Sequence, residues 1–156
     1  MALPPFQSLL DTHGRTVHRF LVASVGPVDA DDCYQETWLS ALRAYPDLRS
    51  GANLRAWLMT IAHRKAIDHV RARARRPVPD ADAGLTVPSA DPVPSGLDPV
   101  WDGVARLPEK QRTAVALRYL GDLSHAEIGT TMGTSEAAAR RNVHEGLKRL
   151  REEHHT

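Results

Sequence analysis

Residues 124–151 read SHAEIGTTMGTSEAAARRNVHEGLKRLR, and this stretch decides the fold. Ser124 is expected to cap a short helix, and Glu127, three residues later, completes a capping box. Gly133-Thr134 predicts a tight turn, after which Ser135 caps a longer helix. A short helix, a glycine turn and a longer basic helix are typical of a helix-turn-helix, which binds DNA through its second helix.

The second helix of this motif is rich in groups that can contact duplex DNA. Its start would enter the major groove, where the planar fork of arginine makes two hydrogen bonds to guanine. Serine and threonine at a helix start can hold a backbone phosphate together with the free amides. The residues that we expect at this surface are Thr134, Ser135, Glu136, Arg140, Arg141, His144 and Lys148. The alternative is a solvated basic face on an ordinary helical hairpin.

Apolar residues also recur at helical spacing in the N-terminal half of the chain. Gly26-Pro27 ends a first helix, and Asp29 or Asp31 offers an N-cap for a second. Tyr45-Pro46 ends that second helix. After a polar loop, a long third helix is expected to begin near Asn53. Near the C-terminal motif, Leu107-Pro-Glu indicates the start of one more helix.

Residues 77–98 differ in composition from both halves. They contain five prolines and four aspartates (Asp80, Asp82, Asp91 and Asp98) but no lysine or arginine. Such a stretch buries little apolar area, and proline interrupts helices. We interpret it as a flexible acidic linker between a domain at 1–76 and a domain at 99–156. The sequence therefore predicts an all-α protein of two small helical domains.

The charge of the whole chain is nearly balanced, with 20 Lys and Arg against 19 Asp and Glu. Net charge alone therefore does not indicate a nucleic-acid partner, but the positive charge is segregated. One basic cluster lies in the last helix, and another, from Arg71 to Arg76, closes the first domain. The second cluster also suits the negative end of a helix, which is a purely structural use. Two clusters flanking an acidic linker favour two DNA contacts.

Several functional classes are not supported by the sequence. Cys33 is the single cysteine, so no internal disulfide can form and a reducing compartment is expected. The chain has no apolar run long enough for a bilayer and no signal-peptide pattern. Its histidines lack the spacing of a zinc site, and no phosphate-binding glycine loop or Ser-His-Asp order occurs. We expect a soluble cytoplasmic protein that is not an enzyme, needs no cofactor or metal, and does not insert into membranes.

Six segments carry a family resemblance. Those similar to region 2 of bacterial sigma factors are DADDCYQETWL (29–39), GANLRAWLMTIA (51–62) and AIDHVR (66–71). Those similar to region 4 are LPEKQR (107–112), LSHAEIG (123–129) and MGTS (132–135). Two such regions joined by a short linker resemble the extracytoplasmic-function (ECF) group of RNA polymerase sigma factors.

The resemblance implies that the protein directs transcription initiation as a subunit of RNA polymerase. Its partners would be core RNA polymerase and promoter DNA; it leaves open an anti-sigma factor, the protein that holds many members of the group inactive. The linker would pass through the polymerase toward the RNA exit path, where its aspartates occupy a channel built for nucleic acid. Two other classes remain: a conventional helix-turn-helix regulator that acts without polymerase, and a helical adaptor.

The resemblance also implies roles for particular residues. The helix from Asp31 to Leu42 would dock on the polymerase clamp; its expected contacts are Asp32, Gln35, Glu36 and Trp38. The alternative for Trp38 is a place in the core. The loop at 47–53 would receive a flipped base of the minus-ten element, and the next helix would follow that strand. The expected minus-ten contacts are Arg49, Asn53, Thr60, His63, Arg64 and Arg71. The last helix would read the minus-thirty-five element.

This chain departs from the family pattern at three places. His63-Arg64 stands where the family usually shows Arg-Asn, and Ala137-Ala138-Ala139 stands where the recognition helix usually reads Gly-Thr-Val. Asn142 replaces a common arginine. The fold expectation survives these changes, but base preference at either promoter element does not transfer.

Overall fold

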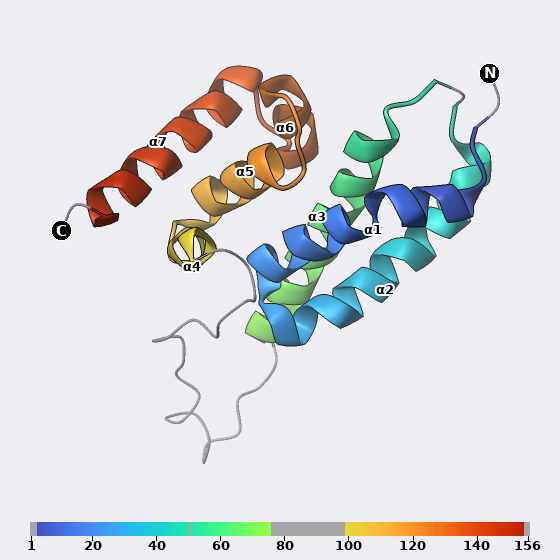
Figure 1. The fold of residues 1–156 in the computed structure, drawn as a ribbon, viewed down its shortest axis with the longest axis horizontal. Helices are drawn as coiled ribbons and strands as arrows, with labels where there is room; N and C mark the ends of the chain where they lie inside the picture. Colours follow the sequence, from blue (N-terminus) through green and yellow to red (C-terminus); the bar gives the residue numbers. More distant parts are fainter. Residues whose placement is uncertain (1–2, 50, 76–98, 155–156) are drawn as a thin grey trace, which may run out of the picture.

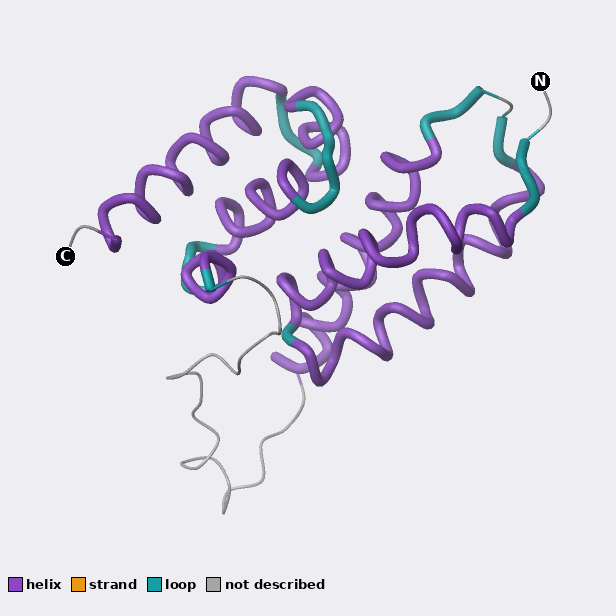
Figure 2. Tube along the Cα trace, viewed as in Figure 1, coloured by secondary structure: helices purple, strands orange, loops and turns teal. Residues whose placement is uncertain are grey.

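The computed structural model describes residues 3–49, 51–75 and 99–154. Every regular element in these ranges is a helix, and none of them contains a strand (Figures 1 and 2). The expectation of an all-α protein is therefore confirmed. The expected linker at 77–98 lies outside the described residues.

The N-terminal bundle consists of three long helices and one short turn of 3-10 helix. These are α1 (Phe6–Val25), α2 (Pro27–Ala44), η1 (Tyr45–Asp47) and α3 (Leu54–Arg75). Each long helix packs against the other two, as Figure 1 shows. Val17, Phe20 and Leu21 of α1 meet Leu58 and Ala62 of α3 in the buried core. This packing holds α3 in place along its length.

The junction between α1 and α2 is sharper than expected. Gly26 has a φ of 89°, a conformation that favours glycine, and it ends α1 while Pro27 begins α2. The prediction that Asp29 or Asp31 caps α2 is therefore wrong, because the helix has already begun. Asp29 lies in the first turn instead, where its carboxylate pairs with Arg73 near the end of α3.

The C-terminal bundle consists of four shorter helices. These are α4 (Val100–Ala105), α5 (Glu109–Tyr119), α6 (His125–Met132) and α7 (Glu136–His154). A small core of Val104, Leu107, Val115 and Leu150 joins α4 to α5 and α7. The six-residue helix α4 was not expected from the sequence, since one and a half turns carry too little periodicity to detect.

The two bundles pack against each other. Helix α1 contacts α4 and α5, and α3 contacts α6. Leu117, Leu123 and Ile128 of the C-terminal bundle belong to the same hydrophobic core as Leu58 and Met59 of α3. The sequence predicted two helical units but not this contact between them.

Candidate nucleic-acid interface

The caps predicted for the helix-turn-helix are present. Ser124 accepts a hydrogen bond from the Glu127 amide at 3.1 Å, and the Glu127 carboxylate accepts one from the Ser124 amide at 2.8 Å. Gly133 adopts the left-handed conformation with a φ of 73°. The Ser135 hydroxyl then accepts from the Ala138 amide at 3.0 Å, which caps α7. These contacts satisfy amide groups that would otherwise lack partners at both helix starts.

Gly129 sets how closely α6 and α7 approach. The Thr134 amide donates to the Gly129 carbonyl at 2.8 Å. A Cβ atom at position 129 would lie 2.9 Å from the Thr134 carbonyl oxygen and 3.1 Å from two backbone atoms of Ser135. Because these neighbours are backbone, they cannot move aside as a flexible side chain would.

Gly129→Ala is therefore expected to lower the free energy of unfolding by about 1–3 kcal/mol, the usual cost of overpacking. Chemical denaturation followed by circular dichroism measures it. The matched control is Gly133→Ala, where no atom lies within 4 Å of the added Cβ and only the positive φ is strained. A Gly129→Ala variant as stable as the wild type would show that the turn is looser than these contacts indicate.

The predicted duplex-binding residues of α7 lie mostly at the surface. Glu136, Arg140, His144 and Lys148 follow one another at four-residue spacing and are all exposed. Such spacing places them in one stripe along the helix. An Arg140 guanidinium nitrogen lies 3.6 Å from a Glu136 carboxylate oxygen, which orients the arginine along the stripe. Ser135 and Arg141 are exposed beside the stripe, and Thr134 is half-buried.

The predicted minus-ten residues are divided between surface and interior. Arg49, Asn53, Arg64 and Arg71 are exposed, Thr60 is half-buried and His63 is buried. Asn53 caps α3 by accepting from the Ala56 amide at 3.1 Å. The start of the long helix near Asn53 is thereby confirmed, although the polar loop before it is described only in part because residue 50 lies outside the described residues.

A cavity of about 460 Å³ lies between this part of α3 and α6. Thr60 and Arg64 line it from α3, and Asn53 lines it from the position just before that helix. Glu127 and Thr131 line it from α6. Trp57 also lines it and is half-buried, with its ring 6.1 Å from that of Tyr45. The structure thus brings three predicted strand-binding residues together around one hollow, and it adds the ring of Trp57, which is not among the predicted contacts.

His63 of α3 is buried near the start of α5. It lines a small cavity together with Glu109 and Thr113 of α5. Burial lowers the pKa of His63 from its ordinary value of 6.5; the Glu109 charge opposes this shift and the Arg64 charge adds to it. In this arrangement His63 lies between Ser24 of α1 and Glu109 of α5 and is only 7% exposed.

The buried imidazole predicts acid sensitivity. Because the folded state disfavours the charged form, its contribution to stability is fully present above pH 6.5 and is lost as pH falls below that value. We expect the free energy of unfolding to fall more steeply between about pH 7.5 and 5.5 in the wild type than in His63→Gln. Denaturant titrations at each pH measure this slope. Equal slopes in the wild type and in His63→Gln would contradict the prediction.

The predicted polymerase-docking residues separate into two faces of α2. Asp32, Gln35 and Glu36 are exposed, but Trp38 is only 7% exposed. Its ring packs edge-on against Phe6 at 5.7 Å between centroids. This placement corrects the expectation of Trp38 as a surface anchor: it belongs to the core.

Two exposed leucines on α2 were missed from the sequence. Leu39 and Leu42 are each 52% exposed. Leu39 follows Gln35 by four residues and Glu36 by three, so it lies on their face of the helix. The spacing of residues in the sequence indicates this difference, because Trp38 falls on the same helix face as the buried residues Ala30, Thr37 and Ala41.

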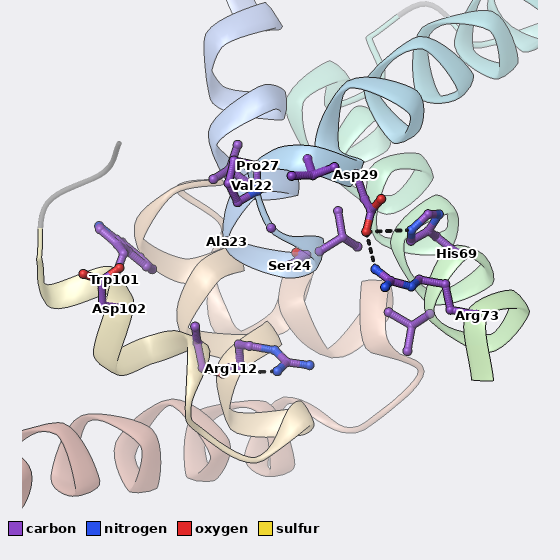
Figure 3. Close-up of a pocket in the computed structure, with 15 residues that line it drawn as sticks. Val22, Ala23, Ser24, Pro27, Asp29, His69, Arg73, Trp101, Asp102 and Arg112 are labelled. Atoms are coloured by element: carbon purple, nitrogen blue, oxygen red, sulfur yellow. Dashed lines mark hydrogen bonds and ion pairs between the residues drawn. The ribbon is translucent and has the colours of Figure 1, made fainter. Parts of the chain in front are cut away.

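A larger cavity of about 810 Å³ lies at the other end of α3 (Figure 3). Asp29 stands in its wall with a carboxylate oxygen 3.3 Å from His69, and the same oxygen pairs with Arg73. Trp101 and Arg112 line it from the C-terminal bundle. None of the residues predicted for the minus-ten or minus-thirty-five element lines this cavity, but Arg73 belongs to the basic cluster from Arg71 to Arg76.

Within the described ranges, neither a reactive cysteine nor a metal site is supported. Burial raises the pKa of the Cys33 thiol to about 11, with the charges of Glu36, Asp29 and Asp32 adding to the shift, so the thiolate form is strongly disfavoured. No group of three His, Cys, Asp or Glu side chains there could hold a metal ion. None of the described helices is both long and apolar enough to cross a membrane.

Comparison with known families and proteins gives consistent matches. The family model for Sigma-70 region 2 matches residues 9–76, and that for Sigma-70, region 4 matches residues 97–150. The RNA polymerase sigma factor CarQ of Myxococcus xanthus is 33% identical over 153 residues, which cover 94% of this chain and 87% of CarQ. The ECF RNA polymerase sigma factor SigF of Caulobacter vibrioides is 37% identical over 133 residues, 83% of this chain and 73% of SigF.

Solved structures show the same fold. The sigma factor RpoE of Bartonella quintana, in complex with the anti-sigma factor NepR, superposes with a TM-score of 0.78 at 23% identity. The match covers 94% of each chain. CnrH, in complex with the cytosolic domain of CnrY, superposes with a TM-score of 0.68 at 23% identity, covering 93% of this chain and 84% of CnrH.

Proposed function

Since this chain belongs to the extracytoplasmic-function group of RNA polymerase sigma factors and directs transcription initiation, we propose that three of its surfaces divide that work. A domain at 1–76 binds core polymerase through α2 and the minus-ten element through α3. A domain at 99–156 binds the minus-thirty-five element through α7. The observation that carries this proposal is the capped helix-turn-helix, which leaves Arg140 and Arg141 exposed on its second helix.

The polymerase-docking surface combines charge with apolar area. Asp32, Gln35 and Glu36 offer carboxylate and amide groups to a basic and polar partner. Leu39 and Leu42, which are exposed, supply the apolar anchors in place of the buried Trp38. Buried apolar anchors surrounded by polar contacts are the usual arrangement of a protein interface.

The minus-ten surface is suited to a single strand. Small and polar groups at 47–53 and the hollow beside Trp57 can take an unstacked base, and base contacts of this kind offset the cost of lost pairing. Exposed arginines along α3 can follow the phosphates. The proposed contacts are Arg49, Asn53, Thr60, His63, Arg64 and Arg71; of these, His63 is buried and would have to become exposed before it could meet DNA.

The minus-thirty-five surface reads duplex DNA. The start of α7 presents its free amides and Ser135 to a phosphate, while the stripe from Glu136 to Lys148 faces the major groove. Arg140 and Arg141 have the geometry to pair with guanine edges. The remaining proposed contacts are Thr134 and His144.

The partners follow from this division of work. Core RNA polymerase and promoter DNA are required, and the cytoplasm is the compartment where both would meet this chain. The RpoE relative was solved with an anti-sigma factor, and we propose a partner of the same kind here. A conventional regulator acting without polymerase remains the competing function, supported by the helix-turn-helix alone.

Promoter binding with and without core polymerase separates the two functions. A labelled fragment of the DNA upstream of the protein's own gene is titrated with the protein, and fluorescence anisotropy is recorded. A sigma factor should bind it tightly only when core polymerase is present, and the protein should co-elute with core polymerase in gel filtration. Tight duplex binding by the protein alone, without co-elution, would support the regulator and overturn the proposal.

A further inference from the structure

We propose that Glu136 and Arg140 of α7 together select a single G·C pair in the minus-thirty-five element, with Arg140 on the guanine and Glu136 on the amino group of the paired cytosine. This inference rests on the proposed function, in which the start of α7 enters the major groove. It adds a base preference to that surface, and it makes Glu136 a specificity-determining residue.

The charged ends of these two side chains lie side by side. Glu136 precedes Arg140 by four residues, so both project from one face of α7. An Arg140 guanidinium nitrogen lies 3.6 Å from a Glu136 carboxylate oxygen, and the side chains are 61% and 56% exposed. The pair therefore offers DNA a fork of hydrogen-bond donors directly beside an acceptor.

Glu136 is not needed as the cap of α7. The Ser135 hydroxyl already caps the helix by accepting from the Ala138 amide at 3.0 Å. An acidic side chain in the first turn also suits the positive end of a helix, which is a purely structural use. That use needs no particular partner, whereas the ion pair with Arg140 directs the carboxylate along the stripe that faces DNA. The next residue, Ala137, is exposed and small, so it leaves room for base edges to approach.

The major-groove edge of a G·C pair matches this arrangement. Guanine presents two acceptors, N7 and O6, and the paired cytosine presents its N4 amino group as a donor. O6 and N4 are hydrogen-bonded to each other, so they lie about 2.9 Å apart. The order acceptor, acceptor, donor complements the two donors of Arg140 followed by the carboxylate of Glu136. An A·T pair presents acceptor, donor, acceptor at the same points and would oppose both side chains.

The carboxylate makes the selection strict. An ionised carboxylate only accepts hydrogen bonds, and only cytosine and adenine offer an amino donor in the major groove. Against an oxygen of guanine or thymine, Glu136 would lose water without gaining a partner. Arg140 therefore favours guanine, while Glu136 disfavours pairs that place an oxygen opposite it. Specific interfaces commonly combine an attractive and a repulsive element in this way.

Binding of holoenzyme to a set of promoter duplexes tests the inference. Each pair of the minus-thirty-five element is replaced in turn by the three other pairs, and affinities are measured by competition in fluorescence anisotropy. For the wild type we expect one position at which G·C exceeds every other pair by at least about fivefold. The control for a general loss of negative charge is Glu152→Ala, which lies exposed near the far end of α7 and should keep the wild-type ratios.

Arg140→Ala isolates the contribution of Glu136. Pairs are written here with the base that faces Arg140 first, so G·C and T·A both place an amino group opposite Glu136. Without Arg140, the carboxylate should still favour these two pairs over A·T and C·G by at least about fivefold. Adding Glu136→Ala to the same protein should abolish this preference.

Glu136→Ala alone should lower the preference for G·C at that position and strengthen binding to the wrong pairs, because a negative charge next to the DNA is lost. A purely structural role for Glu136 predicts weaker binding to all duplexes in equal proportion. That result would overturn the inference, as would Arg140→Ala holoenzyme that nowhere favours G·C and T·A over A·T and C·G. Wild-type holoenzyme that tolerates every replacement in the element would instead overturn the function proposed for α7.

Discussion

Replacing Leu39 and Leu42 by aspartate is expected to abolish stable binding to core RNA polymerase. Both side chains are 52% exposed on the face of α2 that carries Gln35 and Glu36, so they are free to anchor a partner. Loss of a central apolar anchor costs about 2 kcal/mol or more of binding free energy, and the two together should weaken binding by at least about a thousandfold. An aspartate at each position also adds a charge that would have to be desolvated.

Gel filtration and fluorescence titration with labelled core polymerase measure this loss. The matched control is Tyr119→Asp, which replaces a side chain of similar exposure, 54%, on α5 outside the proposed surface. Both variants should keep the wild-type circular dichroism spectrum, because none of the three side chains is buried. Wild-type affinity in the Leu39 and Leu42 double variant would remove this face of α2 from the docking surface.

Replacing Arg140 and Arg141 by alanine should produce the second large loss, in promoter recognition by the holoenzyme. Each arginine is exposed on α7, and loss of a base or phosphate contact costs about 1–3 kcal/mol. The double variant should still bind core polymerase, because that surface lies on the other bundle. Its weakened binding should also show a smaller dependence on salt if phosphate contacts are lost.

Anisotropy titrations of holoenzyme with duplex promoter DNA at several salt concentrations measure this effect. Arg149→Ala, at an exposed arginine near the far end of the same helix, is the control for a general loss of positive charge. If both proteins bind as tightly as the wild type, Arg140 and Arg141 face solvent and α7 is not the recognition helix.

Local signals in the sequence predicted much of the fold. Ser124, Glu127, Gly133 and Ser135 each form the cap or turn expected of them, because capping depends on groups within four residues of one another. The start of α3 at Asn53 follows from the same chemistry. The prediction of a cap at Asp29 was wrong for a local reason as well, because α1 already ends at Gly26 and α2 begins at Pro27.

The contact between the bundles could not be predicted in this way. Met59 and Gly121 lie far apart in the sequence, and neither position alone indicates its partner. Of the predicted site residues, those on α7 stay accessible, while Thr60 and His63 on α3 are covered by helices from the other bundle. The departure from the family pattern at His63 thus falls on a residue in the contact between bundles. The sequence around position 63 does not indicate that this residue lies in the contact between the bundles.

Run-off transcription is the most direct test of the central claim, that this chain recruits core polymerase to promoters through α2, α3 and α7. Purified core polymerase is incubated with DNA from upstream of the protein's own gene, with the wild-type protein, with the Leu39 and Leu42 variant, or with the Arg140 and Arg141 variant. The account predicts transcripts from one defined start with the wild type, and their loss with either variant. Transcripts that do not depend on the protein, or that both variants support fully, would contradict it.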